Sequence, residues 1–232
     1  MNQTRQLPAA LHRSRASPVD SEIQIVVVED HPPLRQGLEL LLTAQGFRMI
    51  GSAGCAEQGA RMIRARRPDV AIIDIGLGDA SGTDLAKTMA HEAPTTAIVL
   101  YTGSLNATVI DDAVGSGAGA LVLKTSPLQH VADAIRAVAA GRTYVDSAVA
   151  SMSSGRPGGH GTRRTSRREG QVLGLLAGGC TTQQIARALF LSPETVQTHV
   201  RNATRKLGAR GRLHAVILAL INGEIDPPDT TR

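Results

Sequence analysis

Five polar side chains of this sequence directly follow short apolar runs, and together they could do chemistry. They are Glu29, Asp30, Asp74, Thr102 and Lys124. Three carboxylates held close together repel one another, and a divalent cation removes that cost. Oxygen ligands of this kind favour Mg²⁺, which usually shares an oxygen of a bound phosphate. A threonine hydroxyl and a lysine ammonium would bind the remaining phosphoryl oxygens, and Asp74 is the natural nucleophile because a carboxylate can form an acyl phosphate.

These side chains need elements that bring them to one place. The apolar runs at 23–28, 49–53, 70–74, 97–101 and 120–123 predict five strands, and the segments between them have helical spacing. The run at 70–74 does not alternate, which is typical of a strand buried on both faces of a parallel sheet. Strands that alternate with helices predict an α/β fold with a doubly wound parallel sheet. The carboxyl ends of its strands share one edge, so the five side chains would meet there.

Each of these residues also has an ordinary interpretation when it is taken alone. An aspartate at a strand end is more often a turn or cap residue, and a threonine or lysine there is usually solvated. Their joint placement at successive strand ends is what favours a shared site.

Charge and cysteine usage constrain the partners and the compartment. Residues 22–146 hold 10 Lys and Arg against 14 Asp and Glu, whereas residues 147–232 hold 12 against 5. An acidic front half suggests a cation or phosphate site, and a basic back half suggests a polyanion partner. Cys55 and Cys180 are far apart and predict free thiols in a reducing compartment. Without an apolar run near the roughly 18 residues of a membrane span, we expect a cytoplasmic protein with no membrane partner.

The basic back half has the start and stop signals of short helices. Ser166 and Thr181 are each followed three residues later by Glu or Gln, which is the form of a capping box. Ser192 and Pro193 begin a third helix, with the serine as cap and the proline at the first helical position. Two helices joined by a short turn, the second polar on its free face, predict a helix-turn-helix.

The polar face of the third helix fits the major groove of DNA. Glutamine or asparagine can read adenine there, and arginine can read guanine or pair with phosphates. The alternative is a solvated basic face on a small bundle. The candidate DNA-binding residues are Thr181, Ser192, Thr195, Gln197, Thr198, His199, Arg201, Asn202, Arg205 and Lys206.

The front half resembles the receiver domain of bacterial response regulators. The motifs that carry this resemblance are EDHPPLR at 29–35, Asp74 followed by Gly82, Thr102-Gly103, and GAG at 117–119 leading to Lys124. The resemblance implies a flavodoxin-like domain that takes a phosphoryl group on Asp74 from a histidine kinase. It also implies that Glu29, Asp30, Asp74 and the backbone carbonyl of Gly76 hold Mg²⁺, while Thr102 and Lys124 bind the phosphoryl group.

One residue departs from the receiver pattern in a way that touches the switch. Leu121 occupies the place where the family usually has a tyrosine or phenylalanine that rotates on phosphorylation. Tyr101, beside Thr102, is a candidate substitute, although an ordinary packed tyrosine is the simpler interpretation.

The back half is similar to the LuxR-type DNA-binding domain, and the whole chain to the NarL/FixJ class of response regulators. The motifs are Arg168-Glu169, Gly179, Ile185-Ala186, Leu191-Ser192, Thr195-Val196, His199-Val200, Asn202 and Arg205-Lys206-Leu207-Gly208. An apolar stripe follows at Leu213, Val216, Ile217 and Leu220. The stripe closes the core of the small domain, and the resemblance implies that it also joins two copies on DNA. Core alone, and core with a dimer face, both remain open.

The domain boundaries follow from these patterns. We expect a disordered tail at 1–21, a receiver at 22–145, a Ser-, Gly-, Pro- and Arg-rich linker at 146–164, a LuxR-type domain at 165–222 and a tail at 223–232. The predicted function is a DNA-binding response regulator, not an enzyme, whose receiver catalyses phosphoryl transfer to its own Asp74. One alternative is a phosphorylation-independent regulator whose receiver only docks a partner. The other is a phosphoryl sink that drains a kinase.

Overall fold

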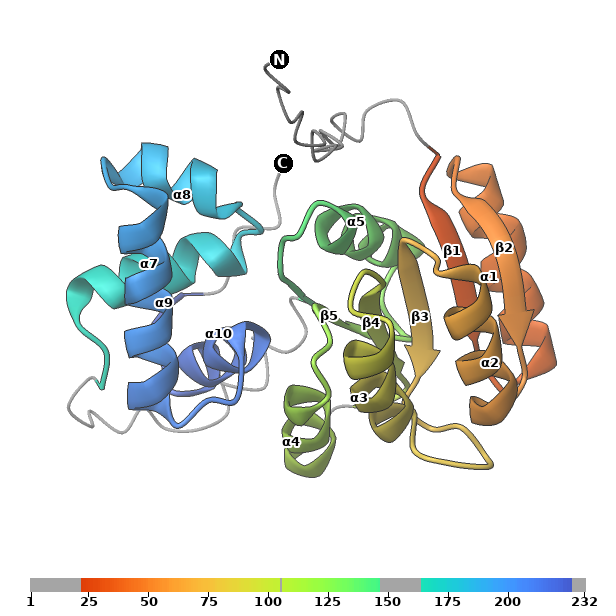
Figure 1. Ribbon diagram of the computed structural model, residues 1–232. Helices are drawn as coiled ribbons and strands as arrows, with labels where there is room; N and C mark the ends of the chain where they lie inside the picture. The colour runs from red at the N-terminus through yellow and green to blue at the C-terminus, as the bar shows by residue number, and fades with distance from the viewer. Residues whose placement is uncertain (1–21, 105, 147–163, 227–232) are drawn as a thin grey trace, which may run out of the picture.

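The computed structural model describes residues 22–104, 106–146 and 164–226, which form an α/β domain and a helical domain (Figure 1). The predicted tail at 1–21, linker residues 147–163 and residues 227–232 lie outside the described residues. Glu224 and Ile225 are buried, so the helical domain continues beyond the expected boundary at residue 222. Within the described ranges, no helix has both the length and the apolar character needed to span a membrane.

The α/β domain contains the predicted parallel sheet. The strands are β1 (Gln24–Val28), β2 (Arg48–Ala53), β3 (Val70–Asp74), β4 (Ala97–Thr102), β5 (Ala120–Leu123) and β6 (Tyr144–Val145). Their order is β2-β1-β3-β4-β5-β6, and every pairing is parallel. The first five strands have the flavodoxin-like order 2-1-3-4-5, which confirms the predicted doubly wound parallel sheet.

The sixth strand is an addition to the five strands predicted from the sequence. β6 has two residues, which is too short to produce a period-two pattern, and it follows the register Ala120↔Tyr144 and Leu121↔Val145. The Tyr144 N–H donates to Gly119 O at 3.1 Å, and the Asp146 N–H donates to Leu121 O at 3.1 Å. Residues 144–145 therefore form a strand because they pair with the free edge of β5, and not because of their local sequence preference.

Five helices cover the two faces of this sheet. They are α1 (Pro32–Ala44), α2 (Ala56–Arg66), α3 (Gly82–Glu92), α4 (Ala107–Gly115) and α5 (Leu128–Ala139). Alternate residues of β1 belong to different cores: Ile25 and Val27 pack with α1 and α5, whereas Val26 and Val28 pack with α2, α3 and α4. Both faces of the strands are thus apolar, which explains the continuous apolar runs in the sequence.

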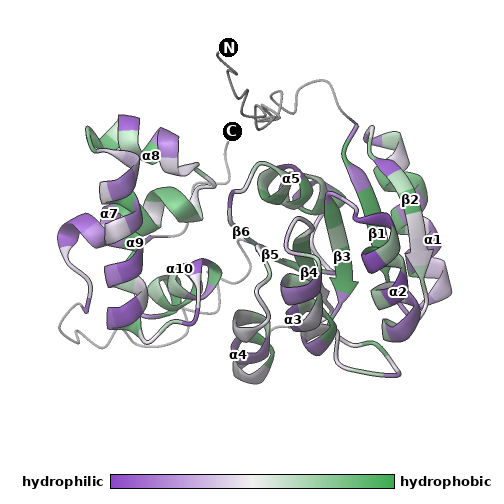
Figure 2. Ribbon diagram, viewed as in Figure 1, coloured by the Kyte–Doolittle hydropathy of each residue, from purple (hydrophilic) through white to green (hydrophobic). Residues whose placement is uncertain are grey.

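The helical domain consists of α7 (Arg167–Ala177), α8 (Thr182–Leu189), α9 (Pro193–Leu207) and α10 (Arg212–Ile221). Both predicted capping boxes form, at Ser166 and at Thr181. Ser192 caps α9 by accepting from Thr195 N, and Gly208 ends α9 in the left-handed conformation. Figure 2 shows polar residues along the outer side of α9, while the strands of the other domain are mostly hydrophobic.

The two domains meet through α10. This helix contacts α9 and α7 on one side and β6 and α4 on the other. Buried residues of α10 and of the sheet belong to one continuous apolar cluster. In Figure 1, α10 lies between α9 and the α/β domain, so the outer face of α9 points away from that domain.

Candidate functional site

The carboxyl ends of β1, β3 and β5 bring the predicted acidic and basic side chains together. Glu29 and Asp74 are 1% and 3% exposed. Lys124 Nζ lies 2.8 Å from Glu29 Oε2 and 2.8 Å from Asp74 Oδ2. Burial acts to lower the pKa of Lys124, but the hydrogen bonds and charges of Asp74 and Glu29 outweigh it, so this pKa lies above its ordinary value. A charged lysine therefore bridges two buried carboxylates.

One lysine does not neutralise the acidic groups at this edge. Glu29, Asp30, His31 and Asp74 each offer a ligand atom, and these atoms lie within 4.8 Å of one another. Glu29 Oε2 and Asp30 Oδ1 are buried atoms that accept no well-directed hydrogen bond among the described residues. Lys124 Nζ lies 2.8 Å from Glu29 Oε2, and His31 Nδ1 lies 2.8 Å from Asp30 Oδ1. Oxygen-rich donors with unsatisfied buried atoms fit a hard cation such as Mg²⁺.

The loop after β3 is fastened around Asp74 by backbone N–H groups. The Gly76 N–H donates to Asp74 Oδ1 at 3.1 Å, and the Gly78 N–H donates to Asp30 Oδ2 at 3.0 Å. Asp79 accepts from the first amide of α2, Ala56 N, at 3.0 Å with both carboxylate oxygens. Gly76, whose carbonyl is the predicted metal ligand, therefore has its backbone next to the carboxylate of Asp74.

Gly82 is required by the close approach of α3 to the end of β3. A Cβ at this position would lie 1.8 Å from the carbonyl oxygen of Asp74 and 2.9 Å from the Cα of Ile75. The Gly82 N–H also donates to Ile75 O at 3.0 Å. Any side chain here would displace the residue that carries the candidate nucleophile.

Thr102 ends β4 as predicted, but its hydroxyl is engaged elsewhere. Thr102 Oγ1 donates to Ser104 O at 2.8 Å, within the loop that leads to α4. Its neighbour Tyr101 is 4% exposed, and the ring centroid lies 5.7 Å from Lys124 Nζ. Leu121 is fully buried in the core on the side of α2, α3 and α4. Tyr101 is therefore a packed core residue, and Leu121 fills the position of the usual aromatic.

The candidate DNA-binding residues form an exposed strip on α9 with the turn before it. Gln197, Thr198, Arg201 and Arg205 are exposed, whereas Val196 and Val200 face the core. The remaining candidates lie around them, with Ser192 exposed and Thr181, Thr195, His199 and Asn202 half-buried. The Arg201 guanidinium donates to Thr198 Oγ1 at 3.3 Å, which directs it along the strip.

Lys206 differs from the other candidates because it has an internal partner. Its Nζ lies 2.8 Å from Oε2 and 2.9 Å from Oε1 of Glu169, a carboxylate on α7 that is 4% exposed. Burial favours the protonated form of Glu169, but the hydrogen bonds from Lys206 and Ser166 outweigh it and lower its pKa. Lys206 thus fastens α9 to α7, which the sequence analysis did not predict.

The predicted dimer stripe on α10 is covered in this structure. Leu213, Val216, Ile217 and Leu220 are 5%, 0%, 0% and 2% exposed. They belong to the apolar cluster that runs through both domains, and α10 as a whole contacts α7, α9, β6 and α4. The core role of the stripe is confirmed, and the dimer role stays a prediction.

Three acidic residues outside the predicted site anchor segments of the chain within their own domains. Asp79 caps α2, as described above. Glu224 accepts from the N–H groups of Arg164 and Thr165, at 3.1 and 2.9 Å, and closes the helical domain. Asp146, 1% exposed, accepts from Ser126 Oγ at 2.5 Å and from Leu123 N at 3.3 Å. Their partners are distant in sequence, so no local motif marked them.

Comparison with known families divides the chain at the same place as the fold. Residues 25–136 match the response regulator receiver domain. Residues 165–219 match the bacterial regulatory proteins of the luxR family.

Two curated relatives match nearly from end to end. The DNA-binding transcriptional activator DevR/DosR of Mycobacterium tuberculosis is 30% identical over 212 residues, which cover 89% of this chain and 98% of that protein. The transcriptional regulatory protein LiaR of Bacillus subtilis is 30% identical over 203 residues, covering 85% and 96%.

Solved structures share the fold. A two-component response regulator of the LuxR family from Aurantimonas sp. is 26% identical with a TM-score of 0.51, covering 54% of this chain and 90% of that one. The RcsB response regulator of Salmonella typhimurium is 22% identical with a TM-score of 0.53, covering 88% and 98%.

Proposed function

We propose that the receiver of this chain accepts a phosphoryl group on Asp74 and thereby controls transcription. The premise is that the chain belongs to the DNA-binding response regulators, which join a receiver domain to a LuxR-type domain. The expected donor is a histidine kinase, and the expected target is double-stranded promoter DNA. The observation that carries the proposal is the convergence of Glu29, Asp30, Asp74 and Lys124 at one strand edge.

The geometry around Asp74 suits a nucleophile. Its Oδ1 is held by the Gly76 N–H and its Oδ2 by Lys124, so the carboxylate is oriented. The proposed metal ligands are Glu29, Asp30, Asp74 and the Gly76 carbonyl, and a bound Mg²⁺ would neutralise phosphoryl charge there. In the transfer, an Asp74 oxygen bonds to phosphorus while the bond from phosphorus to the donor nitrogen breaks. The receiver contributes this catalysis to its own modification and to no other substrate.

Phosphorylation would change the partners of Lys124 and Thr102. The new group carries about −1.5 to −2 charges at pH 7 and three acceptor oxygens. Lys124 would exchange Glu29 for a phosphoryl oxygen, and the Thr102 hydroxyl would exchange the Ser104 carbonyl for another. That exchange releases the β4–α4 loop, and α4 is one of the elements that contacts α10.

The covered stripe of α10 supplies the proposed output. Leu213, Val216, Ile217 and Leu220 cannot join a second copy while α10 lies against α4 and β6. Displacing α4 would free α10 for a homodimer on DNA, with one α9 strip for each half-site. The outer face of α9 is already exposed, so dimerisation, rather than uncovering α9, is the proposed step under control.

The first test measures phosphorylation and DNA binding on the same samples. The full chain is incubated with Mg²⁺ and a small phosphodonor, its intact mass is read, and its affinity for promoter DNA is measured. One added phosphoryl group, absent in Asp74→Asn and accompanied by tighter DNA binding, is the expected result. Phosphorylation without a change in DNA binding would favour the sink or a switch broken at Leu121. DNA binding without phosphorylation would favour a docking receiver.

A second test addresses the DNA-binding strip. Replacing Gln197 and Arg201 together by alanine removes one candidate base contact and one guanidinium, both from exposed positions. We expect specific binding to be lost while the helical circular dichroism stays that of the unmodified chain. Unchanged affinity and unchanged sequence preference would count against α9 as the reading helix.

A further inference from the structure

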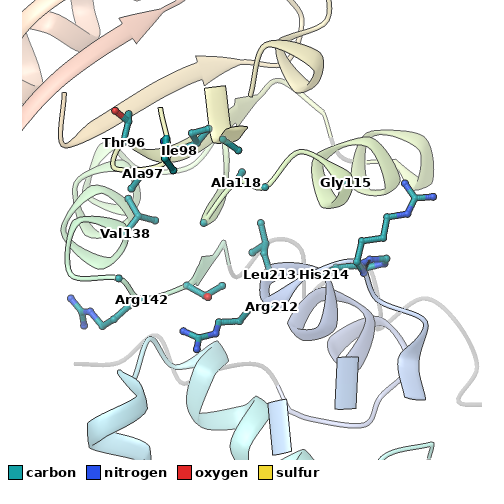
Figure 3. A pocket seen from close by; sticks show the side chains of 18 residues that line it. Thr96, Ala97, Ile98, Gly115, Ala118, Val138, Arg142, Arg212, Leu213 and His214 are labelled. Carbon is teal, nitrogen blue, oxygen red and sulfur yellow. Dashed lines mark hydrogen bonds between the residues drawn. The ribbon is translucent and has the colours of Figure 1, made fainter. Parts of the chain in front are cut away.

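A pocket of about 470 Å³ lies between the two domains, away from the phosphoryl-acceptor edge (Figure 3). The receiver contributes the loops before β4 and β5 and the turn before β6, and the helical domain contributes the α9–α10 loop with the first turn of α10. Apolar side chains, among them Ile98, Ala118, Val138 and Leu213, line part of its wall. This volume falls within the range of about 300–1,000 Å³ that is usual for small-molecule sites.

The charged groups of the pocket all have one sign. Arg142 comes from the receiver, and Arg210 and Arg212 come from the helical domain. No carboxylate is among the 18 residues that line the pocket in the described part of the chain. Within the described part of the chain, no ion pair joins these three arginines to an acidic side chain. Positive side chains that line one pocket without an acidic partner raise its potential, so the pocket favours a negative ligand.

The arginines keep unused hydrogen-bond donors. Arg142 Nη1 donates to Gly179 O across the domain interface at 3.3 Å, while its Nε is buried and has no hydrogen-bond partner among the described residues. Arg212 Nη2 donates to Thr182 Oγ1 at 3.4 Å. A guanidinium carries five N–H donors, so most remain free for a ligand. Burial lowers the pKa of Arg212 because it penalises the charged form, and an anion would remove that penalty.

The start of α10 adds to the positive potential. Gly211, which lines the pocket, is the residue before α10 and supplies no side-chain cap to its first turn. Backbone N–H groups at a helix start, together with the helix dipole, favour phosphate oxygens. Figure 3 shows the Arg142 and Arg212 side chains extending toward the same side of the pocket, one from each domain.

We propose that this pocket binds a phosphorylated small molecule with an apolar body, of which a nucleotide is the simplest example. Arg142 and Arg212 hold the phosphate groups by paired N–H donors, and Ile98, Val138 and Leu213 contact the apolar part. Because Arg142 and Arg212 belong to different domains, one ligand connects both. The ligand therefore stabilises the arrangement in which α10 is covered, and by linkage it weakens dimerisation and DNA binding. This last effect rests on the proposed function, whereas the binding itself does not.

The binding test titrates ATP and, separately, pyrophosphate into the unphosphorylated full chain by calorimetry at fixed ionic strength. EDTA is present so that Mg²⁺ cannot create a phosphate site at Asp74. The test variant is Arg142→Gln with Arg212→Gln, because glutamine replaces the guanidinium by a polar group that carries no charge. We expect its dissociation constant for ATP to rise at least tenfold. Arg142→Gln alone and Arg212→Gln alone should each weaken ATP binding as well. Because these two residues lie in different domains, a folding defect in one variant does not decide the result.

The matched control is Arg201→Ala with Arg205→Ala, which removes two arginines from the exposed α9 strip. This chain should bind ATP as the unmodified chain does. Tighter binding of ATP than of pyrophosphate supports the apolar contacts, and equal binding restricts the ligand to its phosphate groups and overturns the apolar part. Loss of binding in the control alone, or equal binding by all variants, would overturn the pocket as the site. If the unmodified chain binds ATP but its affinity for DNA is the same with and without ATP, only the regulatory effect is refuted.

Discussion

The ion pair between Lys206 and Glu169 yields a prediction that separates a structural lysine from a DNA contact. The side chain of Glu169 is 5% exposed and that of Lys206 is 40% exposed, and their charged atoms lie 2.8 Å apart. Breaking a buried pair by removing one partner costs about 3–5 kcal/mol. Because Lys206 is partly solvated and Glu169 keeps the 2.7 Å bond from Ser166 N, we discount this to about 2 kcal/mol.

Lys206→Met should therefore open the helical domain more often. A loss of about 2 kcal/mol corresponds to about 30-fold faster amide exchange for protected sites of α7 and α9. Hydrogen exchange followed by mass spectrometry on the full chain measures this rate without separating the domains. The salt dependence of DNA binding should stay unchanged where the chain remains folded.

Arg205→Met is the matched control, since Arg205 is the exposed neighbour of Lys206 on the same helix. It should leave amide exchange unchanged and reduce the slope of log affinity against log salt by about 0.9, the value for one lost phosphate contact. The reasoning is refuted if Lys206→Met leaves exchange unchanged, or if it lowers the salt slope as Arg205→Met does.

The same pair predicts how stability depends on acid. The pKa of Glu169 is below its ordinary 4.5, so its contribution is present above pH 4.5 and is lost as the pH falls through the lowered value. Exchange in α7 should therefore quicken below pH 4.5 after correction for intrinsic rates. A Glu169→Gln chain, which cannot ionise there, should lack this component. An identical acid dependence in both chains would assign the effect to other carboxylates.

Three further changes test other parts of the structure. Gly82→Ala, whose Cβ would lie 1.8 Å from Asp74 O, should lower receiver stability in urea by about 3 kcal/mol and prevent phosphorylation. The control is Gly37→Ala, whose Cβ would meet no described atom within 4 Å and which should be neutral or stabilise by about 0.5–1 kcal/mol. Burial holds the pKa of His214 below 6.5, so the contribution of neutral His214 to stability is present above pH 6.5 and is lost as the pH falls below it. Amide exchange of α10 should therefore quicken below pH 6.5, and His214→Gln should remove that response. Asp146→Ala leaves two donors of the β5–α5 loop without their acceptor and should cost about 2 kcal/mol, measured as faster exchange in β5; unchanged exchange would contradict the anchoring role.

Features that depend on near neighbours in the chain were predictable from the sequence. The capping boxes at Ser166 and Thr181 form because each side chain bonds a backbone N–H three residues away, and this needs no tertiary partner. The continuous apolar runs determined the parallel sheet, because only a strand covered on both faces needs apolar residues at every position. Once the sheet is parallel, Glu29, Asp30, Asp74 and Lys124 must share its carboxyl edge.

Other features were decided only by the tertiary structure. Lys206 pairs with a carboxylate 37 residues away, a partner that no local pattern in the sequence indicates. The two residues of β6 become a strand only because β5 offers a free edge. The apolar stripe of α10 has a pattern that suits a core and a dimer face equally. That α10 contacts β6 and α4 as well as α7 and α9 depends on how two separately patterned domains pack. Local pattern specifies which face of an element is apolar, but the partner of that face depends on the packing of the whole chain.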